Sequence, residues 1–463
     1  MNQLARLHGR DAELRGLLAH VAAARRGQPR LAVLYGRRRV GKTFLLQHVL
    51  EQAEIATVYF AATQDLSEAE LHRFVEALEP VLPAALPFPT TWSQVLDAVV
   101  DLAVEKPIAI VLDEVPYLVD SNNAWPSMLQ RAWDRAVNLG KPCHLAIFLT
   151  GSAIATMTKI VSSGGALYER PDEILRLEPF DLPTATAFSG FDDAVKAVEC
   201  YAACGGYPLL HRRWNVEETA MQNLVRLAGD PTGALATNAS TLLLDLGDAA
   251  IYRRLLSAIG RGSTKFGEIT SHVGQRVDSA LEILLRGGYL RRSTPIGESR
   301  RTEPTWEIAD TYLRFWFSVI ERDYQLIEGG QGSAVLARNE PSWRTTIENT
   351  FENEARRHLI RASESGELAS MIVGRWWTSR PHQAEIDVVG LTGNRWSLVG
   401  EVKWSSRFTF HDWQQFEANV AAAGDRAVGA QRAVWSRGPI QPQVLSAAPG
   451  LLTFTPADVA GLK

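Results

Sequence analysis

The residues of this chain most suited to chemistry lie in a glycine-rich turn that follows a hydrophobic segment. Residues 31–35 are hydrophobic, and residues 36–43 read Gly-Arg-Arg-Arg-Val-Gly-Lys-Thr. The glycines let the backbone curl so that successive N–H groups face a phosphate. Lys42 can then reach the β- and γ-phosphates of a nucleotide, and the Thr43 hydroxyl can bind Mg²⁺. The helix that begins near Thr43 adds its positive N-terminal end to the same site.

The segments on either side of this turn favour a nucleotide site. A buried strand before it and an amphipathic helix after it form the setting in which such turns bind phosphates. A glycine-rich turn that holds no ligand is the alternative. We therefore expect ATP and Mg²⁺ as cofactors. The residues expected to line the phosphate site are Gly36, Arg37, Arg38, Arg39, Val40, Gly41, Lys42, Thr43 and Phe44.

Two carboxylates end a second hydrophobic segment, residues 107–112. Active groups sit at the carboxyl ends of buried parallel strands. We expect Asp113 to hold Mg²⁺ and Glu114 to polarise the water that attacks the γ-phosphate. A solvated strand end is the alternative, but Asp113 follows Lys42 by 71 residues. That spacing favours the site and leaves room for one more strand and one more helix.

A third hydrophobic strand, residues 144–150, ends in Thr-Gly-Ser. A polar side chain at this strand end, Thr150 or Ser152, would lie beside the γ-phosphate and sense it. A turn that merely ends the strand fits the spacing equally well.

A second group of ionisable residues lies near the C-terminus. Asp387 lies in one predicted strand of a hairpin, and Glu401 and Lys403 lie in the next. Residues of the same parity share a face of a strand, so Asp387 can meet Glu401 and Lys403 there. Two carboxylates, with Glu352 as a third, make an oxygen-rich metal site, and Lys403 can orient or deprotonate water for phosphodiester hydrolysis. A surface salt bridge is the alternative.

The elements that must position these residues follow from the hydrophobic pattern. Strands and helices alternate through about residue 177, which predicts a parallel sheet covered by helices. Residues 183–248 read as mostly helical, and residues 249–325 as three helices and a hairpin, the winged-helix pattern. A glycine-rich stretch at residues 328–333 suggests a linker before the last segment. The fold class expected is α/β and multidomain.

The charge of the chain is uneven. The formal net charge is -4, which does not indicate a nucleic-acid-binding protein. Residues 253–301, however, carry ten Lys or Arg against four Asp or Glu, a local charge of +6 that leaves -10 for the remainder. This basic block favours DNA as a partner. Packing of the hairpin arginines Arg291, Arg292, Arg300 and Arg301 against an acidic neighbouring domain is the alternative.

Composition argues against a membrane or secreted protein. No apolar run reaches the ~18 residues that span a bilayer, and the N-terminal residues lack the apolar core of a signal peptide. Three cysteines are too few for a disulfide framework, which fits a reducing cytosol. Cys200 and Cys204 have no matching ligand pair nearby, so we interpret them as helix packing. We expect a cytoplasmic protein without a membrane partner.

Together these motifs resemble the archaeal-type P-loop ATPases, which are related to AAA+ and STAND proteins. The resemblance implies that Arg10 lies where such proteins contact the adenine. Arg170 would stabilise transition-state charge as an arginine finger, but Glu169 stands where a glycine is expected, and a surface arginine is the equal alternative. The matching segments are Gly9–Leu14, Tyr35–Thr43, Leu112–Leu118, Leu149–Ser152, Leu167–Arg170, Gly205–Pro208 and Ile308–Trp316.

The C-terminal segment resembles the DUF234 module of the same family, which looks like a PD-(D/E)xK restriction-endonuclease fold, active or degenerate. The matching positions are Glu352, Gly374–Trp377, Glu385–Asp387 and Gly400–Trp404. With this resemblance we expect a P-loop ATPase core at residues 1–180, a helical lid at 181–248, a winged helix at 249–325 and a nuclease-like domain at 340–463.

The expected function is an ATPase whose nucleotide state controls a DNA-binding winged helix and a nuclease-like domain. The alternative is a regulatory or signalling switch of the STAND type. Such a switch would act through self-association or a protein partner, and its nuclease fold would be inactive.

Overall fold

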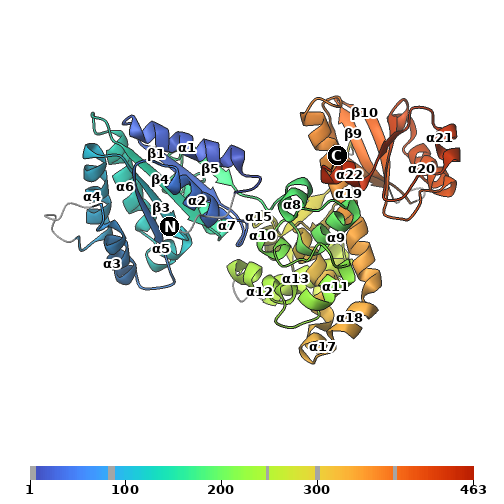
Figure 1. Ribbon diagram of the computed structural model, residues 1–463, viewed down its shortest axis with the longest axis horizontal. Helices are drawn as coiled ribbons and strands as arrows, with labels where there is room; N and C mark the ends of the chain where they lie inside the picture. The colour runs from blue at the N-terminus through green and yellow to red at the C-terminus, as the bar shows by residue number, and fades with distance from the viewer. Residues whose placement is uncertain (1–6, 82–88, 247–249, 298–302, 379–382, 463) are drawn as a thin grey trace. The chain divides into compact units, whose positions relative to one another are not determined.

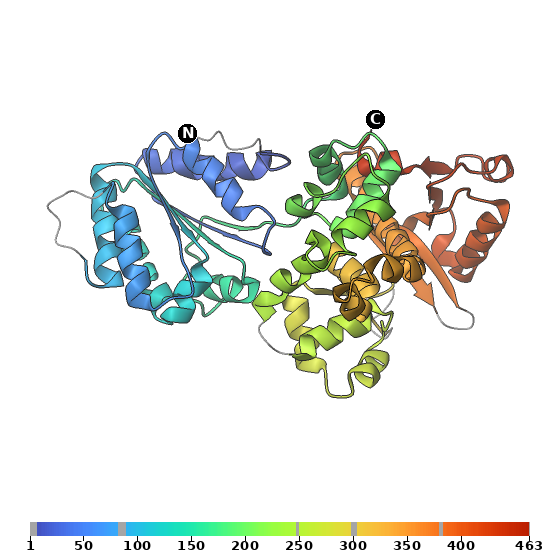
Figure 2. The same ribbon diagram turned by 60° about the horizontal axis from the view of Figure 1, so that its bottom comes forward.

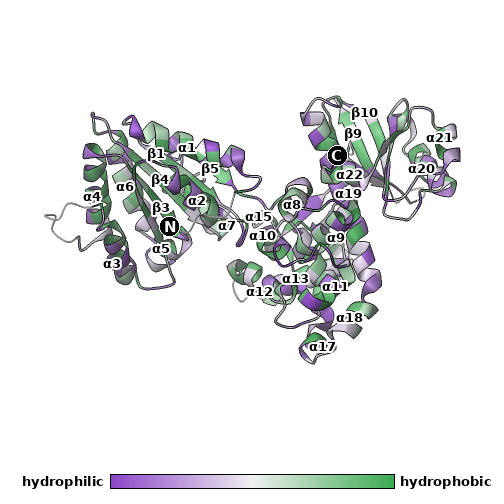
Figure 3. Cartoon of the chain, viewed as in Figure 1, coloured by the Kyte–Doolittle hydropathy of each residue, from purple (hydrophilic) through white to green (hydrophobic). Residues whose placement is uncertain are grey.

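The computed structural model describes residues 7–81, 89–246, 250–297, 303–378 and 383–462 (Figure 1). The chain divides into two compact units, Met1–Pro179 and Phe180–Lys463. Each unit is built around its own sheet, and the hydrophobic residues concentrate on the strands of these sheets (Figure 3). None of the described helices is both long and apolar enough to cross a membrane.

The first unit holds a five-stranded sheet in the order β2-β3-β4-β1-β5, and every neighbouring pair is parallel. The predicted parallel sheet is therefore confirmed. The two strands β3 and β4 are buried along their whole length, as the continuous apolar sequence requires. The strands are β1 (Arg30–Tyr35), β2 (Ala56–Ala61), β3 (Ile108–Asp113), β4 (Leu145–Gly151) and β5 (Glu173–Arg176).

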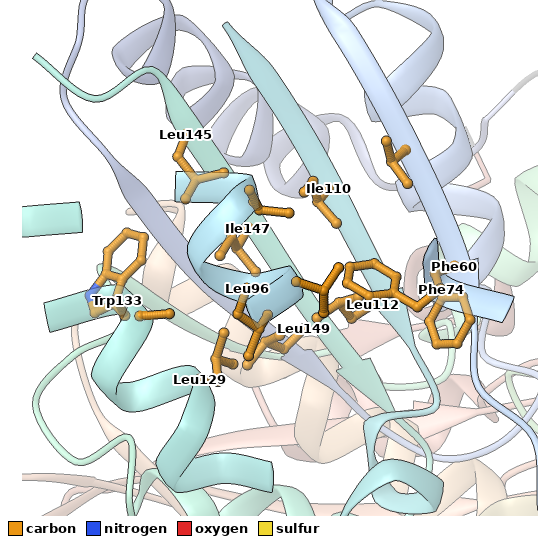
Figure 4. Close-up of a cluster of buried hydrophobic side chains, with 14 of the residues drawn as sticks. Phe60, Phe74, Leu96, Ile110, Leu112, Leu129, Trp133, Leu145, Ile147 and Leu149 are labelled. Carbon is orange, nitrogen blue, oxygen red and sulfur yellow. The ribbon is translucent and has the colours of Figure 1, made fainter. Parts of the chain in front are cut away.

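Helices cover both faces of this sheet (Figure 2). On one face, aromatic and aliphatic side chains form the core that Figure 4 shows. Phe74 lies between Phe60 and Trp92, with ring centroids 5.1 and 5.5 Å apart. These contacts pack α3 and α4 against β2, next to the strand β3 that ends in Asp113. The helices are α1 (Asp11–Arg25), α2 (Lys42–Glu51), α3 (Ser67–Leu78), α4 (Trp92–Glu105), α5 (Val115–Ser121), α6 (Trp125–Val137) and α7 (Ile154–Val161).

The second unit begins with helices and a two-stranded antiparallel hairpin. The helices up to the hairpin are α8 (Leu182–Ser189), α9 (Ala194–Cys204), α10 (Pro208–His211), α11 (Ala220–Leu227), α12 (Ala234–Leu243), η1 (Leu244–Leu246), α13 (Ala250–Gly260), α14 (Phe266–Val273) and α15 (Asp278–Arg286). The hairpin and the helices after it are β6 (Leu290–Ser293), β7 (Thr305–Ile308), α16 (Thr311–Phe315), η2 (Trp316–Ile320), η3 (Glu321–Asp323), α17 (Tyr324–Glu328), α18 (Gly332–Arg338) and α19 (Glu340–Glu364).

The suggested linker at residues 328–333 is wrong. These residues form a close turn from α17 into α18. A Cβ on Gly332 would lie 1.9 Å from the carbonyl oxygen of Gly229, so the backbone packs directly on another part of the unit. Glycine is used here for close approach, not for flexibility.

The C-terminal part of the second unit is a mixed sheet in the order β12-β11-β10-β9-β8. Strands β8, β9 and β10 pair antiparallel, whereas β10, β11 and β12 pair parallel. This separate mixed sheet agrees with the predicted α/β, multidomain class. The elements are β8 (Ile372–Thr378), β9 (Ala384–Thr392), β10 (Arg395–Lys403), α20 (Phe410–Ala422), η4 (Gly424–Ala427), β11 (Gln431–Ser436), α21 (Pro442–Ala447), β12 (Leu452–Phe454) and α22 (Pro456–Ala460).

Candidate functional site

The glycine-rich turn runs from the end of β1 to the start of α2. Gly41 precedes the helix with φ at 100°, and a Cβ there would meet nothing within 4 Å, so the turn is open on this side. Arg39 adopts a left-handed φ of 66°, an uncommon conformation that concentrates at functional sites. The buried Lys42 donates from Nζ to the carbonyl oxygens of Gly36 and Arg37 at 2.8 and 3.0 Å. The turn therefore holds the lysine ammonium over its own backbone.

The end of β3 meets the start of α2 through a hydrogen bond between the two predicted Mg²⁺ ligands. Thr43 Oγ1 donates to Asp113 Oδ2 at 2.7 Å, and Asp113 Oδ1 accepts from the backbone N–H of Glu114 at 2.9 Å. Hydroxyl and carboxylate oxygens are the ligands that Mg²⁺ prefers. The Thr43 hydroxyl and the Asp113 carboxylate are therefore suitable ligands for the Mg²⁺ that the sequence implies.

Tyr59 of β2 is a site residue that the sequence analysis missed. Its hydroxyl donates to Asp113 Oδ2, the oxygen that also accepts from Thr43. Burial and the neighbouring Asp113 carboxylate raise the pKa of Tyr59 above its ordinary value, so the phenol stays a donor. The only signal in the sequence was the period of β2. Ala61 pairs with Asp113, and Tyr59 lies two residues earlier on the same face.

Glu114 and Ser152 are also brought together. Glu114 has a left-handed φ of 55°, an uncommon conformation for a residue other than glycine. Its Oε2 accepts from the Ser152 backbone N–H at 3.1 Å and from the Ser152 hydroxyl at 2.9 Å. Thr150 is fully buried, and its hydroxyl has no hydrogen-bond partner within the described residues. The ends of β1, β3 and β4 thus converge on one edge of the sheet.

Arg170 lies in a different set of contacts. Its Nε and Nη2 donate to the two oxygens of Asp134 on α6 at 2.8 and 3.0 Å, and Nη1 donates to the Tyr168 carbonyl oxygen. The Asp134 carboxylate raises the pKa of Arg170 above its ordinary value. This bidentate pair supports the reading of Arg170 as a structural surface arginine.

The remaining predicted nucleotide contacts surround the turn. Arg10 donates to the Glu178 carbonyl oxygen at 2.6 Å and to Glu13 at 3.1 Å. It thereby ties the start of α1 to the segment after β5. Arg38 donates to the Tyr117 hydroxyl at 3.0 Å. Arg37 and Val40 are buried, and the Phe44 ring lies 4.5 Å from that of His48 one turn later.

The second predicted group comes from β9, β10 and α19. Val388 pairs with Gly400, so Asp387 and Glu401 take the next position in the same register and share a face. Asp387 Oδ2 accepts from the Val402 backbone N–H at 2.9 Å, and Lys403 Nζ lies 3.3 Å from Glu401 Oε1. On α19, Arg356 donates to the Asp387 carbonyl oxygen at 2.7 Å.

The carboxyl groups in this second cluster disfavour each other's charge. Burial and the Asp387 carboxylate raise the pKa of Glu352 to about 8 and that of Glu401 to about 8. Burial raises the pKa of Asp387 to about 6, against the opposing hydrogen bond from Val402. Nevertheless, within the described part of the chain no three His, Cys, Asp or Glu side chains are arranged to hold a metal ion. The Glu401–Lys403 ion pair is the contact that this arrangement shows.

Glu352→Gln is expected to reduce the pH dependence of stability between about pH 4.5 and about pH 8. In that window the folded protein keeps a proton that the unfolded chain releases. The free energy of unfolding therefore falls as pH rises. The amide cannot ionise, so the variant should lose this part of the decline. Thermal unfolding at pH 5 and pH 8 measures it, with Glu348→Gln on the same helix as the control. A decline as steep in Glu352→Gln as in the wild type would contradict the assignment.

Two protein families match separate segments of the chain. Residues 8–210 match a family described as an ATPase domain predominantly from Archaea, and residues 316–416 match DUF234, a family of archaeal and bacterial proteins of unknown function. An uncharacterized protein of Methanocaldococcus jannaschii is 26% identical over 388 residues, which cover 80% of this chain and 82% of that protein.

A Walker-type ATPase of Pyrococcus abyssi is similar in structure, with a TM-score of 0.50 at 19% identity. The match covers 67% of this chain and 96% of that one, and at this identity it supports the fold alone. The two family matches, in the order predicted from the motifs, confirm the resemblance stated above. The chain thus carries an N-terminal domain of the archaeal-type P-loop ATPase family and, after it, a DUF234 module.

Proposed function

We propose that the protein binds ATP with Mg²⁺ and hydrolyses it at the edge of the first sheet, and that its nucleotide state controls the modules of the second unit. One observation carries the first part. Strands β1 and β3 flank β4, and their ends bring Lys42, Thr43, Asp113 and Glu114 to one place. There Thr43 Oγ1 lies 2.7 Å from Asp113 Oδ2. A glycine-rich turn without a ligand would not need a buried lysine and two carboxylates beside it.

Each residue has a distinct task in this proposal. Lys42 exchanges its bonds to the turn carbonyls for the β- and γ-phosphates and grips them. Thr43 and Asp113 would hold Mg²⁺, which when bound neutralises charge on the phosphate oxygens. Glu114 accepts a proton from the attacking water or orients it, once Ser152 no longer occupies its Oε2. Tyr59 keeps Asp113 oriented by donating to its carboxylate.

The second part concerns helices α13–α15 and the hairpin β6–β7, which we propose form a winged helix. Helix α13 packs against both α14 and α15, and α15 leads into β6. The basic residues nearest α15, Arg276 and Arg286, have side chains that are 95% and 75% exposed. They are the described arginines best placed to meet DNA phosphates.

The hairpin arginines have other contacts. Arg291 donates to Glu307 at 2.8 Å and to Asn353 of α19, and Arg292 lies over the Trp306 ring. These packing contacts compete with the expected role of Arg291 and Arg292 in binding phosphates. Arg300 and Arg301 lie outside the described residues.

The Arg276→Ala, Arg286→Ala double variant is expected to weaken duplex DNA binding and to make it less sensitive to salt. Each lost phosphate contact should reduce the slope of log K against log salt by about one. Fluorescence anisotropy at several salt concentrations, with ADP or a non-hydrolysable ATP analogue, measures this slope and its dependence on nucleotide. Arg338→Ala, an exposed arginine on α18, is the control. An unchanged slope, or no binding to any duplex, would contradict the DNA-binding proposal.

For the C-terminal module we propose a nuclease-like fold with Glu352, Asp387 and Glu401 facing Lys403. Nicking of plasmid DNA with Mg²⁺ or Mn²⁺ tests whether it cleaves, and Glu401→Ala and Lys403→Ala should abolish any nicking. We derive no cleavage step, because the described carboxylates do not form a metal-binding set as they stand.

A regulatory switch with an inactive nuclease fold is the second candidate function. Two observations favour it. Lys403 is paired with Glu401, as in an inert ion pair. The exposed charges around α15 also balance, because Arg276 lies 3.6 Å from Asp278 and Arg286 lies 3.0 Å from Glu282. If the wild-type protein hydrolyses ATP but neither binds duplex DNA nor nicks plasmid DNA, this second candidate is favoured.

A further inference from the structure

A cavity of about 520 Å³ lies in the second unit. It borders the C-terminal carboxylate cluster through Arg375, a charge neighbour of Glu352, but none of the three carboxylates of that cluster is on its lining. It is bounded by the end of α13, strand β7, the segment from α16 to η3, the first turns of α19, and β8. Its volume lies within the range of small-molecule sites. The cavity is therefore large enough to hold a ligand of the second unit alone.

The charge of the lining is strongly positive. The charged side chains on it are Arg261, Arg314, Arg322, Arg375 and Glu307. Glu307 is already bound by Arg291 and by the Ser293 hydroxyl, each at 2.8 Å. Glu307 also lies 3.9 Å from Arg375, and Arg261 lies 2.9 Å from Glu321. The lining therefore carries four guanidinium groups against one carboxylate, and part of this excess is offset by carboxylates around the cavity.

Arg314 is the most unusual member of this lining. It is 9% exposed, and its Nη2 donates to the Ile308 carbonyl oxygen at 2.9 Å. Among the described residues it makes no direct ion pair, but the Glu307 carboxylate lies near enough to attract its charge. Burial and the nearby Arg291 lower the pKa of Arg314 to about 10, which still leaves it charged at neutral pH. Glu307 is shared with Arg291 and Arg375, so the charge of Arg314 is offset only in part. A buried charge of this kind is costly, and a bound anion would lower that cost.

The cavity also reaches the N-terminal end of a long helix. Pro341 and Ser342, in the first turn of the 25-residue α19, are on the lining. Helix N-termini favour anions through their free N–H groups and the helix dipole. The helix end and the Arg314 guanidinium are independent features, and both favour a negatively charged ligand.

We propose that this cavity binds a phosphate-bearing small molecule, with Arg314 and Arg322 contacting its phosphate. Guanidinium groups match phosphate oxygens in geometry and charge. Arg314 and Arg322 are the lining arginines for which no direct ion pair is found among the described residues. The guanidinium of Arg314 is about nine-tenths buried. A small molecule that enters the cavity can reach it, whereas a nucleic-acid backbone would need an open groove. The site would give the second unit a ligand of its own, separate from the nucleotide at Lys42.

The test uses the full chain with Lys42→Ala, which removes the phosphate site of the first unit. Isothermal titration calorimetry with inorganic phosphate, pyrophosphate and AMP measures binding, and citrate tests whether any polyanion suffices. Arg314→Gln, which keeps a donor for the Ile308 carbonyl, and Arg322→Ala, an exposed position, are compared with Arg338→Ala outside the cavity.

We expect at least one phosphate probe to bind the Lys42→Ala protein. Its affinity should fall by more than about ten-fold in Arg314→Gln and by a smaller factor in Arg322→Ala, with no change in Arg338→Ala. If Arg314→Gln fails to fold, as judged by its thermal unfolding, Arg322→Ala decides alone. Three results would overturn the proposal: no phosphate probe binds, citrate binds as tightly as pyrophosphate, or binding is the same in the cavity variants and the control. Because Lys42 is absent throughout, failure here leaves the ATPase proposal untouched.

Discussion

Replacing Glu114 by Gln is expected to leave ATP binding intact and to slow ATP hydrolysis by about a hundred- to ten-thousand-fold, the usual contribution of a general base. The amide has nearly the shape of the carboxylate and can still meet Ser152. It cannot accept a proton or orient water as a charged group does. Phosphate release and ATP affinity, measured on the same preparation, separate chemistry from binding.

Asp120→Asn is the matched control for this variant, because Asp120 is an exposed carboxylate at the end of α5. It should hydrolyse ATP at the wild-type rate. If Glu114→Gln also turns over ATP at that rate, Glu114 is not the base. The left-handed φ of 55° would then need another explanation.

Replacing Lys42 by Ala is expected to remove measurable ATP binding. Lys42 is 5% exposed, and its ammonium lies within the turn where the β- and γ-phosphates are expected. Losing a buried charge that faces a phosphate costs about 2–5 kcal/mol, at least roughly thirty-fold in Kd. Calorimetric titration with ATP and Mg²⁺ measures the effect. Lys141→Ala, an exposed lysine of the same unit, should bind like the wild type.

Wild-type affinity in Lys42→Ala would show that ATP is held elsewhere. A loss of affinity with a lowered melting temperature would instead indicate a damaged turn, because Lys42 also binds the Gly36 and Arg37 carbonyls. Thermal unfolding without nucleotide distinguishes the two results.

The sequence predicted the first unit well because parallel strands leave little freedom. Buried strands are marked by continuous apolar residues, and their carboxyl ends must meet at one edge of the sheet. The contact between Thr43 and Asp113 follows from this geometry. Tyr59 could not be found in the same way, because its contact with Asp113 requires β2 to be the neighbour of β3. The local hydrophobic pattern does not predict the order of strands in a sheet.

Arginine roles were the least predictable. Arg170 was a candidate finger, but its partner Asp134 lies 36 residues earlier on α6. Arg291 was a candidate phosphate contact, but its partner Asn353 lies 62 residues later. Long arginine side chains pair with groups that tertiary packing brings close to them. A single sequence carries no signal for such long-range pairs.

The C-terminal carboxylate cluster could be predicted in part. The parity of β10 and the hairpin turn predicted that Asp387, Glu401 and Lys403 share a face, and the register agrees. How deeply the cluster is buried, and the presence of Arg356 beside Asp387, could not be read from strand period. These features set the raised pKa values and the pairing of Lys403 with Glu401.

Phosphate release from ATP by the wild-type chain tests the central claim most directly. It should be measured with Mg²⁺ and with EDTA, in the presence and absence of duplex DNA, alongside Lys42→Ala and Glu114→Gln from the same purification. We predict release that requires Mg²⁺, disappears in Lys42→Ala and falls at least about a hundred-fold in Glu114→Gln. Release that persists in Lys42→Ala or in EDTA, or no release under any of these conditions, would contradict ATP hydrolysis at this site.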